Sequence, residues 1–179
     1  MAEPDRISIQ HILISFADAP TEATRSQAEA ETLAKSVLEQ AQSGTDFNEL
    51  VRTHTDDNVM PEDPQPGTYH MLNNGVEGLT FPEFISELNG RAQEMETELV
   101  GKMKAGDIST EELNEQMNEF LEGLRAEADQ KAPTMPYPRG AMVPAFGDVG
   151  FALEVGQVGM ADFHAENSPF GWHIIRRVD

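Results

Sequence analysis

Two segments rich in β-branched residues lie at opposite ends of the chain, and each contains one histidine. Residues 6–16 read R-I-S-I-Q-H-I-L-I-S-F, and the chain ends in F-G-W-H-I-I-R-R-V-D. Both patterns predict β-strands. A histidine inside an apolar strand loses its hydration, so it either has a buried partner or is kept there for chemistry. If the two strands pair, His11 and His173 come close to each other.

The segments next to these strands predict three helices. An amphipathic helix runs to Ser43-Gly44, with Thr24 and Gln27 expected as its capping box. A shorter helix follows in the stretch D-F-N-E-L-V-R-T-H. Near the C-terminus, V-P-A-F-G-D-V-G-F-A-L predicts a short helix, and E-V-G-Q-V predicts a turn before the last strand. The pattern indicates strands and helices in one mixed domain.

Residues 70–138 have a different composition from the segments on either side. They contain 14 acidic and 5 basic residues, a net charge of 5 − 14 = −9. Pro82 suits the first position of a helix, and Ser109 with Glu112 forms a capping box for a second one. The segment therefore predicts a helical hairpin. Its apolar stripes most simply pack against each other. A groove for unfolded chains and a dimer interface are the alternatives.

The charge of the whole chain limits its partners. The formal net charge is −20, which disfavours nucleic acid and anionic lipid as ligands. The chain has no cysteine, which excludes disulfides and thiol nucleophiles. No apolar run reaches the roughly 18 residues of a membrane span, so no membrane insertion is expected. The start lacks a signal-peptide pattern. As written, this favours a cytoplasmic protein, or an exported or periplasmic one if a signal peptide was removed.

An ordered set of short motifs flanks the acidic segment. The set is I-Q-H-I-L-I, G-T-D-F-N-E-L-V, H-T-D-D, R-G-A-M-V-P-A-F-G-D-V-G-F-A-L and F-G-W-H-I-I. It resembles the parvulin-type peptidyl-prolyl isomerases over nearly all of the chain outside residues 70–138. The resemblance implies an α+β fold with a small antiparallel sheet wrapped by helices. Residues 1–69 and 139–179 would form one discontinuous isomerase domain, with an acidic helical hairpin inserted at residues 70–138.

The resemblance also implies a site on the concave side of the sheet. The residues it marks as catalytic are His11, Asp57, Ser168 and His173. The residues it marks as substrate-binding are Tyr69, Met142, Phe146 and Phe170. The two imidazoles are expected to share a hydrogen bond and to orient Asp57 or a hydroxyl group.

The chemistry of such an isomerase needs few special groups. Rotation about a peptide bond faces a barrier of about 18–20 kcal/mol, and cis and trans X-Pro differ by about 0.5–1 kcal/mol. A catalyst must prefer the twisted amide over both planar forms, which requires no nucleophile and no cofactor. The expected substrates are proline-containing polypeptides or unfolded proteins. A weakly catalytic or non-catalytic chaperone module is the alternative. Two histidines and a carboxylate also suit a metal, but no H-E-x-x-H spacing is present and no metal is predicted.

Two stretches depart from the parvulin pattern. P-Q-P-G-T-Y stands where these proteins usually have a G-G-D-L-G-like stretch, so Pro66 replaces a leucine of the pocket wall. Phosphate-directed members carry a basic cluster after the first strand. Here that loop has Asp18, Glu22 and only Arg25. Selectivity for phosphorylated Ser/Thr-Pro is therefore not expected.

Overall fold

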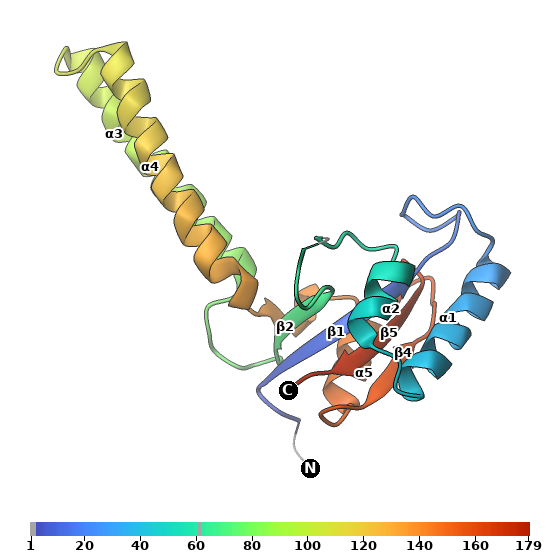
Figure 1. Cartoon of the computed structure of the whole chain (residues 1–179). Helices are drawn as coiled ribbons and strands as arrows, with labels where there is room; N and C mark the ends of the chain where they lie inside the picture. Colours follow the sequence, from blue (N-terminus) through green and yellow to red (C-terminus); the bar gives the residue numbers. More distant parts are fainter. Residues whose placement is uncertain (1–2, 61) are drawn as a thin grey trace. The chain divides into compact units, whose positions relative to one another are not determined.

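The computed structural model describes residues 3–60 and 62–179 and divides into two compact units (Figure 1). Residues Met1–Val76 and Tyr137–Asp179 form one unit, here called the sheet unit, and Glu77–Pro136 form the other, the hairpin unit. The expected insertion at 70–138 is therefore too long at both ends. Residues 70–72 belong to a strand of the sheet, and Tyr137–Pro138 form another.

The sheet unit contains a five-stranded sheet in the order β3-β2-β1-β5-β4. The strands are β1 (Arg6–Ile14), β2 (Thr68–Leu72), β3 (Tyr137–Pro138), β4 (Val158–Ala161) and β5 (Trp172–Arg177). All neighbours are antiparallel except β2 and β3, which are parallel. The expectation of an antiparallel sheet is wrong at this edge, because the chain leaves the sheet after β2 and re-enters it in the same direction.

Helices cover both faces of the central strands. On one face, Ile12 and Ile174 pack in a core beneath α1 (Gln27–Gln42) and α2 (Phe47–His54). On the other face, Ile9 and Ile175 pack beneath α5 (Pro144–Ala152). Every residue of β1 after the first is therefore buried. Because side chains alternate between the faces, His11 lies on the α5 side of the sheet together with Ile9.

The helix starts follow local hydrogen bonding. At the start of α1 the N-cap is Ser26, which accepts a bond from the Glu29 backbone N–H at 3.3 Å while the Glu29 carboxylate accepts one from the Ser26 N–H at 2.8 Å. The expected box of Thr24 and Gln27 is wrong by two residues. An anionic carboxylate is a stronger acceptor than an amide at the positive end of a helix, so the serine and glutamate pair prevails.

The hairpin unit consists of α3 (Phe81–Ala105) and α4 (Thr110–Lys131). Their apolar stripes pack on each other through a cluster that includes Phe84, Leu88 and Leu124. Short 3₁₀ helices follow at Ala132–Thr134 and, back in the sheet unit, at Arg139–Ala141. Among the described residues, no helix has the length and apolar character needed to cross a membrane.

Gly171 allows the end of the chain to approach β1 closely. Its φ is +138°, and a Cβ built there would lie 2.2 Å from the Ile14 carbonyl oxygen. We expect Gly171→Ala to lower the free energy of unfolding by about 2–4 kcal/mol. Urea titration followed by the fluorescence of Trp172, the single tryptophan, reports on the sheet unit.

Gly44→Ala is the matched control, because Gly44 has φ +95° with nothing within 4 Å of an added Cβ. It tests backbone strain without a clash and should cost about 1 kcal/mol. If both variants lose the same free energy of unfolding, the close contact with β1 is not what requires glycine at position 171.

Candidate active site

A pocket of about 200 Å³ opens on the α5 side of the sheet unit. Its lining residues are His11, Leu13, Asp57, Tyr69, Met142, Val143, Phe146 and Phe170. It is smaller than the roughly 300–1,000 Å³ of sites for drug-sized ligands. It therefore suits one apolar side chain or ring of a longer ligand.

Most of the residues expected at the site meet in this pocket, but two lining residues were not predicted. Leu13 follows His11 by two positions on the same strand, so the alternation of side chains offered a signal for it. Val143 lies in the short link between Met142 and α5 and gave no signal of its own. His173 does not line the pocket and lies against the ring of Phe146 instead, with the two ring centroids 5.4 Å apart.

The segment Thr55–Asp57 is hydrogen-bonded to the C-terminal end of β1. Thr55 Oγ1 accepts bonds from the backbone N–H groups of Leu13 at 3.1 Å and Asp57 at 3.2 Å. The Asp56 N–H donates to the Leu13 carbonyl at 2.8 Å. The pairing of β2 with β1 ends at Gln10, so this segment takes over the free edge of β1. These bonds bring Asp57 beside His11.

Asp57 is the main acceptor in the pocket. Its Oδ2 lies 3.1 Å from His11 Nε2 and accepts a bond from the Tyr69 hydroxyl at 3.0 Å. Its Oδ1 accepts from the Asn58 N–H at 2.9 Å. The hydrogen bond from His11 lowers the pKa of Asp57, aided by the charge of His11 and by the bonds from Tyr69 and Asn58, and outweighs the opposing effect of burial. Asp57 is therefore a carboxylate at neutral pH.

Tyr69 supplies the hydroxyl donor of this group. Burial raises the pKa of Tyr69, and the neighbouring charge of Asp57 raises it further. The phenol thus stays protonated and keeps donating to the carboxylate. Resemblance had marked Tyr69 for substrate contact, and its bond to Asp57 was not predicted.

The two histidines stack, and the expectation that they share a hydrogen bond is wrong. Their ring centroids are 5.6 Å apart with an interplanar angle of 26°. Leu13 pairs with His173 and His11 with Ile175, so the imidazoles are diagonal neighbours on one face and lie plane to plane. Among the described residues, His11 Nδ1 and both ring nitrogens of His173 are buried without a hydrogen-bond partner. Burial lowers the pKa of His173 to about 3, and the charge of His11 acts in the same direction. His173 is therefore neutral and serves as a packing surface.

Ser168 lies outside the pocket, contrary to its expected place in the polar network. It is fully buried, and its hydroxyl donates to the Gly171 carbonyl at 2.8 Å. Its backbone forms an isolated bridge with His164. These bonds shape the loop that carries Phe170, a pocket residue that is 37% exposed.

The altered stretch P-Q-P-G-T-Y forms the pocket wall through Tyr69 instead of Pro66. Pro66 is buried, and its carbonyl accepts a bond from Gln10 Nε2 at 3.0 Å. Gly67 has φ +72° and its carbonyl accepts from the His11 N–H at 2.9 Å. A Cβ at Gly67 would lie 2.6 Å from the His11 carbonyl oxygen, so only glycine fits here. The turn at Gly67 thereby places Tyr69, two residues later, in the lining of the pocket.

The site combines an apolar pocket, an ionised carboxylate and a hydroxyl donor. Within residues 3–60 and 62–179, no group of three or more His, Asp or Glu side chains is arranged to hold a metal ion. Such a pocket has room for an apolar side chain or ring beside a fixed negative charge.

The comparison with known families identifies the family to which the chain belongs. Residues 1–109 match the family described as the PPIC-type PPIASE domain. The chain thus belongs to this family of peptidyl-prolyl cis/trans isomerases, which confirms the resemblance and the α+β fold. No curated protein matches the chain. The matched region includes His11, Asp57 and Tyr69. Met142 and Phe146 lie outside the matched region but line the same pocket.

The burial of neutral His173 predicts a loss of stability in acid. In the unfolded chain His173 binds a proton below a pKa of 6.5, whereas in the folded chain it does so only below about 3. Between these values the unfolded state binds more protons, so the free energy of unfolding falls by up to about 1.4 kcal/mol for each pH unit. Urea titrations from pH 7 to pH 4 measure this slope.

His173→Gln removes the titrating group and provides the comparison. We expect its free energy of unfolding to depend less on pH than that of the wild type. The residual slope includes Asp57, whose lowered pKa also stabilises the fold above its titration range. Parallel slopes in the two proteins would mean that His173 is not buried in its neutral form.

Proposed function

We propose that the sheet unit accelerates rotation about X-Pro bonds without covalent chemistry, by binding the twisted amide more tightly than the planar one. Its membership in the PPIC-type family makes the chain a peptidyl-prolyl cis/trans isomerase that acts on proline-containing polypeptides. The observation that carries the mechanism is the carboxylate of Asp57, fixed by His11 and Tyr69 at an apolar pocket.

The pocket supplies the grip on the proline ring. Phe146 belongs to α5 and is buried between this helix and the sheet, and Met142 packs against the same cluster. Phe170 lines the pocket from the loop before β5. Apolar contact with the pyrrolidine excludes water and leaves the preceding carbonyl free to rotate. Removing water also strengthens the field of nearby charges.

The carboxylate supplies the preference for the twisted form. Conjugation in a planar amide places partial negative charge on the carbonyl oxygen, and twisting removes it. A fixed anion beside that oxygen disfavours the planar states more than the twisted one. Tyr69 and His11 donate to Asp57 and hold its carboxylate in place. Such preorganised charges need no reorientation during the reaction.

Removing the charge of Asp57 tests this mechanism. We expect Asp57→Asn to lower kcat/KM by about 10²-fold, mainly through kcat, since it keeps the size of the side chain but loses its charge. Phe146→Ala should act mainly on KM. A protease-free assay on X-Pro peptides measures both against an uncatalysed exchange of roughly 10–100 s.

Asp18→Asn is the control, since it makes the same change of net charge at an exposed position in the loop after β1. It should behave as the wild type. A kcat/KM for Asp57→Asn equal to that of this control would exclude the electrostatic mechanism, even if the enzyme is active.

The loop after β1 offers no free cation to a phosphate. Arg25 Nη2 donates to Asp56 Oδ1 at 3.1 Å, and Nη1 donates to Asp56 Oδ2 and to the Ser15 carbonyl. The guanidinium is thus occupied in holding the segment that carries Asp57. We infer that the site does not select phosphorylated residues before proline.

Peptides with phosphoserine, glutamate and alanine before proline test this selectivity. We expect kcat/KM for phosphoserine to be no higher than for alanine, because Asp57 and the acidic loop repel the dianion. A tenfold preference for the phosphorylated peptide over the glutamate peptide would contradict the inference.

A further inference from the structure

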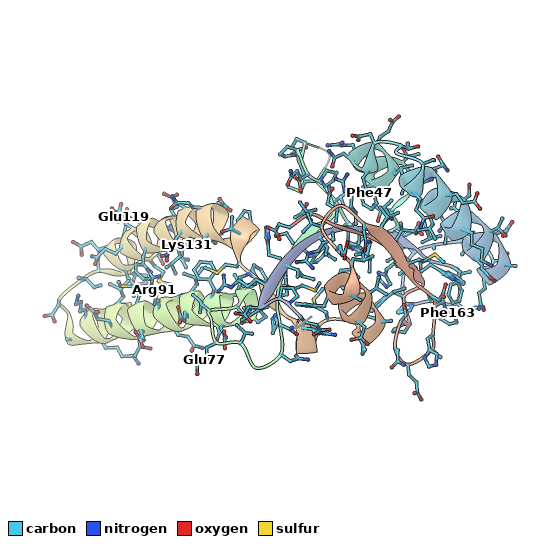
Figure 2. All side chains as sticks on the ribbon, turned by 90° about the horizontal axis from the view of Figure 1, so that it is seen from below. Phe47, Glu77, Arg91, Glu119, Lys131 and Phe163 are labelled. Atoms are coloured by element: carbon cyan, nitrogen blue, oxygen red, sulfur yellow. The ribbon has the colours of Figure 1, made fainter. Side chains whose placement is uncertain are left out.

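The hairpin unit has a groove of its own between its two helices, with a volume of about 510 Å³. It is lined by Arg91, Met95, Gln116, Glu119, Phe120, Gly123 and Leu124. Figure 2 shows Arg91 and Glu119 on the two different helices of the hairpin. Its lining combines the apolar side chains of Met95, Phe120 and Leu124 with charged and amide groups. An apolar lining with a few polar groups is the pattern of a binding groove.

Gly123 keeps this groove open at a cost to the helix. Glycine inside a helix is about 1 kcal/mol less favourable than alanine. At Gly123, which has no positive φ, an added Cβ would meet nothing within 4 Å. Neither backbone conformation nor internal packing requires glycine here. The missing side chain leaves free space where Gly123 lines the groove.

The charge around the groove favours a cationic ligand. The hairpin unit has 14 acidic and 5 basic residues, a net of 5 − 14 = −9. Within this fully described unit, Arg91 and Lys131 both pair with Glu127, and Lys102 pairs with Glu98. Three of the cations are thus shared between two carboxylates, and the other acidic side chains form no ion pair inside the unit. A second copy of the chain, with its net charge of −20, would be repelled.

We propose that the groove binds cationic polypeptide segments in which a large apolar side chain is flanked by lysine or arginine. The apolar side chain fills the space above Gly123, where the flexible thioether of Met95 adapts to its shape. The flanking cations interact with Glu119 and the neighbouring carboxylates. This site is separate from the isomerase pocket and does not depend on its chemistry.

Binding of labelled peptides to the whole chain tests the proposal. The probe is a short proline-free peptide with a central phenylalanine flanked by lysines, followed by fluorescence anisotropy. One companion peptide has glutamates in place of the lysines, and another has serine in place of the phenylalanine. We expect saturable binding of the first peptide only, weakened by salt.

Gly123→Leu fills the groove, and Gly101→Leu is its matched control. Gly101 is also a helical glycine with nothing within 4 Å of an added Cβ, but it does not line the groove. Leucine favours helix at both positions. We expect Gly123→Leu to weaken binding by at least about tenfold, or 1.4 kcal/mol, and Gly101→Leu to leave it unchanged.

Three results would overturn the proposal. They are no binding by the wild type, equal affinity in Gly123→Leu, and a wild-type dimer that Gly123→Leu converts to a monomer. The last result would show that a second copy occupies the groove. Isomerase activity on a short X-Pro peptide should be the same in Gly123→Leu and the wild type. Binding without isomerase activity, or the reverse, therefore separates failure of this proposal from failure of the catalytic one.

Discussion

The antiparallel pairing of β1 with β5 is the constraint on which the rest of the structure depends. It joins the two ends of the chain, with Leu13 opposite His173. Both strands are buried on both faces, so a slip by one residue would move the histidines from the α5 side into the core under α1 and α2. The close approach of Gly171 to Ile14 fixes this register at the edge of the pocket. The position of each imidazole thus follows from strand pairing and does not require a hydrogen bond to its side chain.

The site is built around the carboxylate of Asp57. The burial of His173 next to this site is unfavourable in free energy. Asp57 receives three hydrogen bonds, whereas His173 has two buried nitrogens without a partner among the described residues. An apolar side chain would avoid that cost at the same position. The histidine keeps a flat ring stacked on His11 and in edge contact with Phe146, which holds both pocket residues from below.

Sequence patterns predicted the parts of the fold that local interactions determine. Apolar alternation identified β1 and β5, and the apolar periodicity of the helices identified α1 and α2. The short strands β2, β3 and β4 were not predicted, because they are defined by their partners more than by their own composition. Ser168 was misplaced because motif spacing carries no information on how a loop turns. The bond from Tyr69 to Asp57 joins segments twelve residues apart across a proline-containing loop, and only the fold brings them together.

The insertion point explains how a long hairpin can be added without loss of the pocket. The chain leaves from β2 and returns in β3, and these strands are neighbours, with Met71 beside Tyr137. An excursion that starts and ends on adjacent strands opens no gap in the sheet. The ring of Tyr137 lies 5.8 Å from that of Tyr69, between centroids, so the returning strand supports the residue that donates to Asp57.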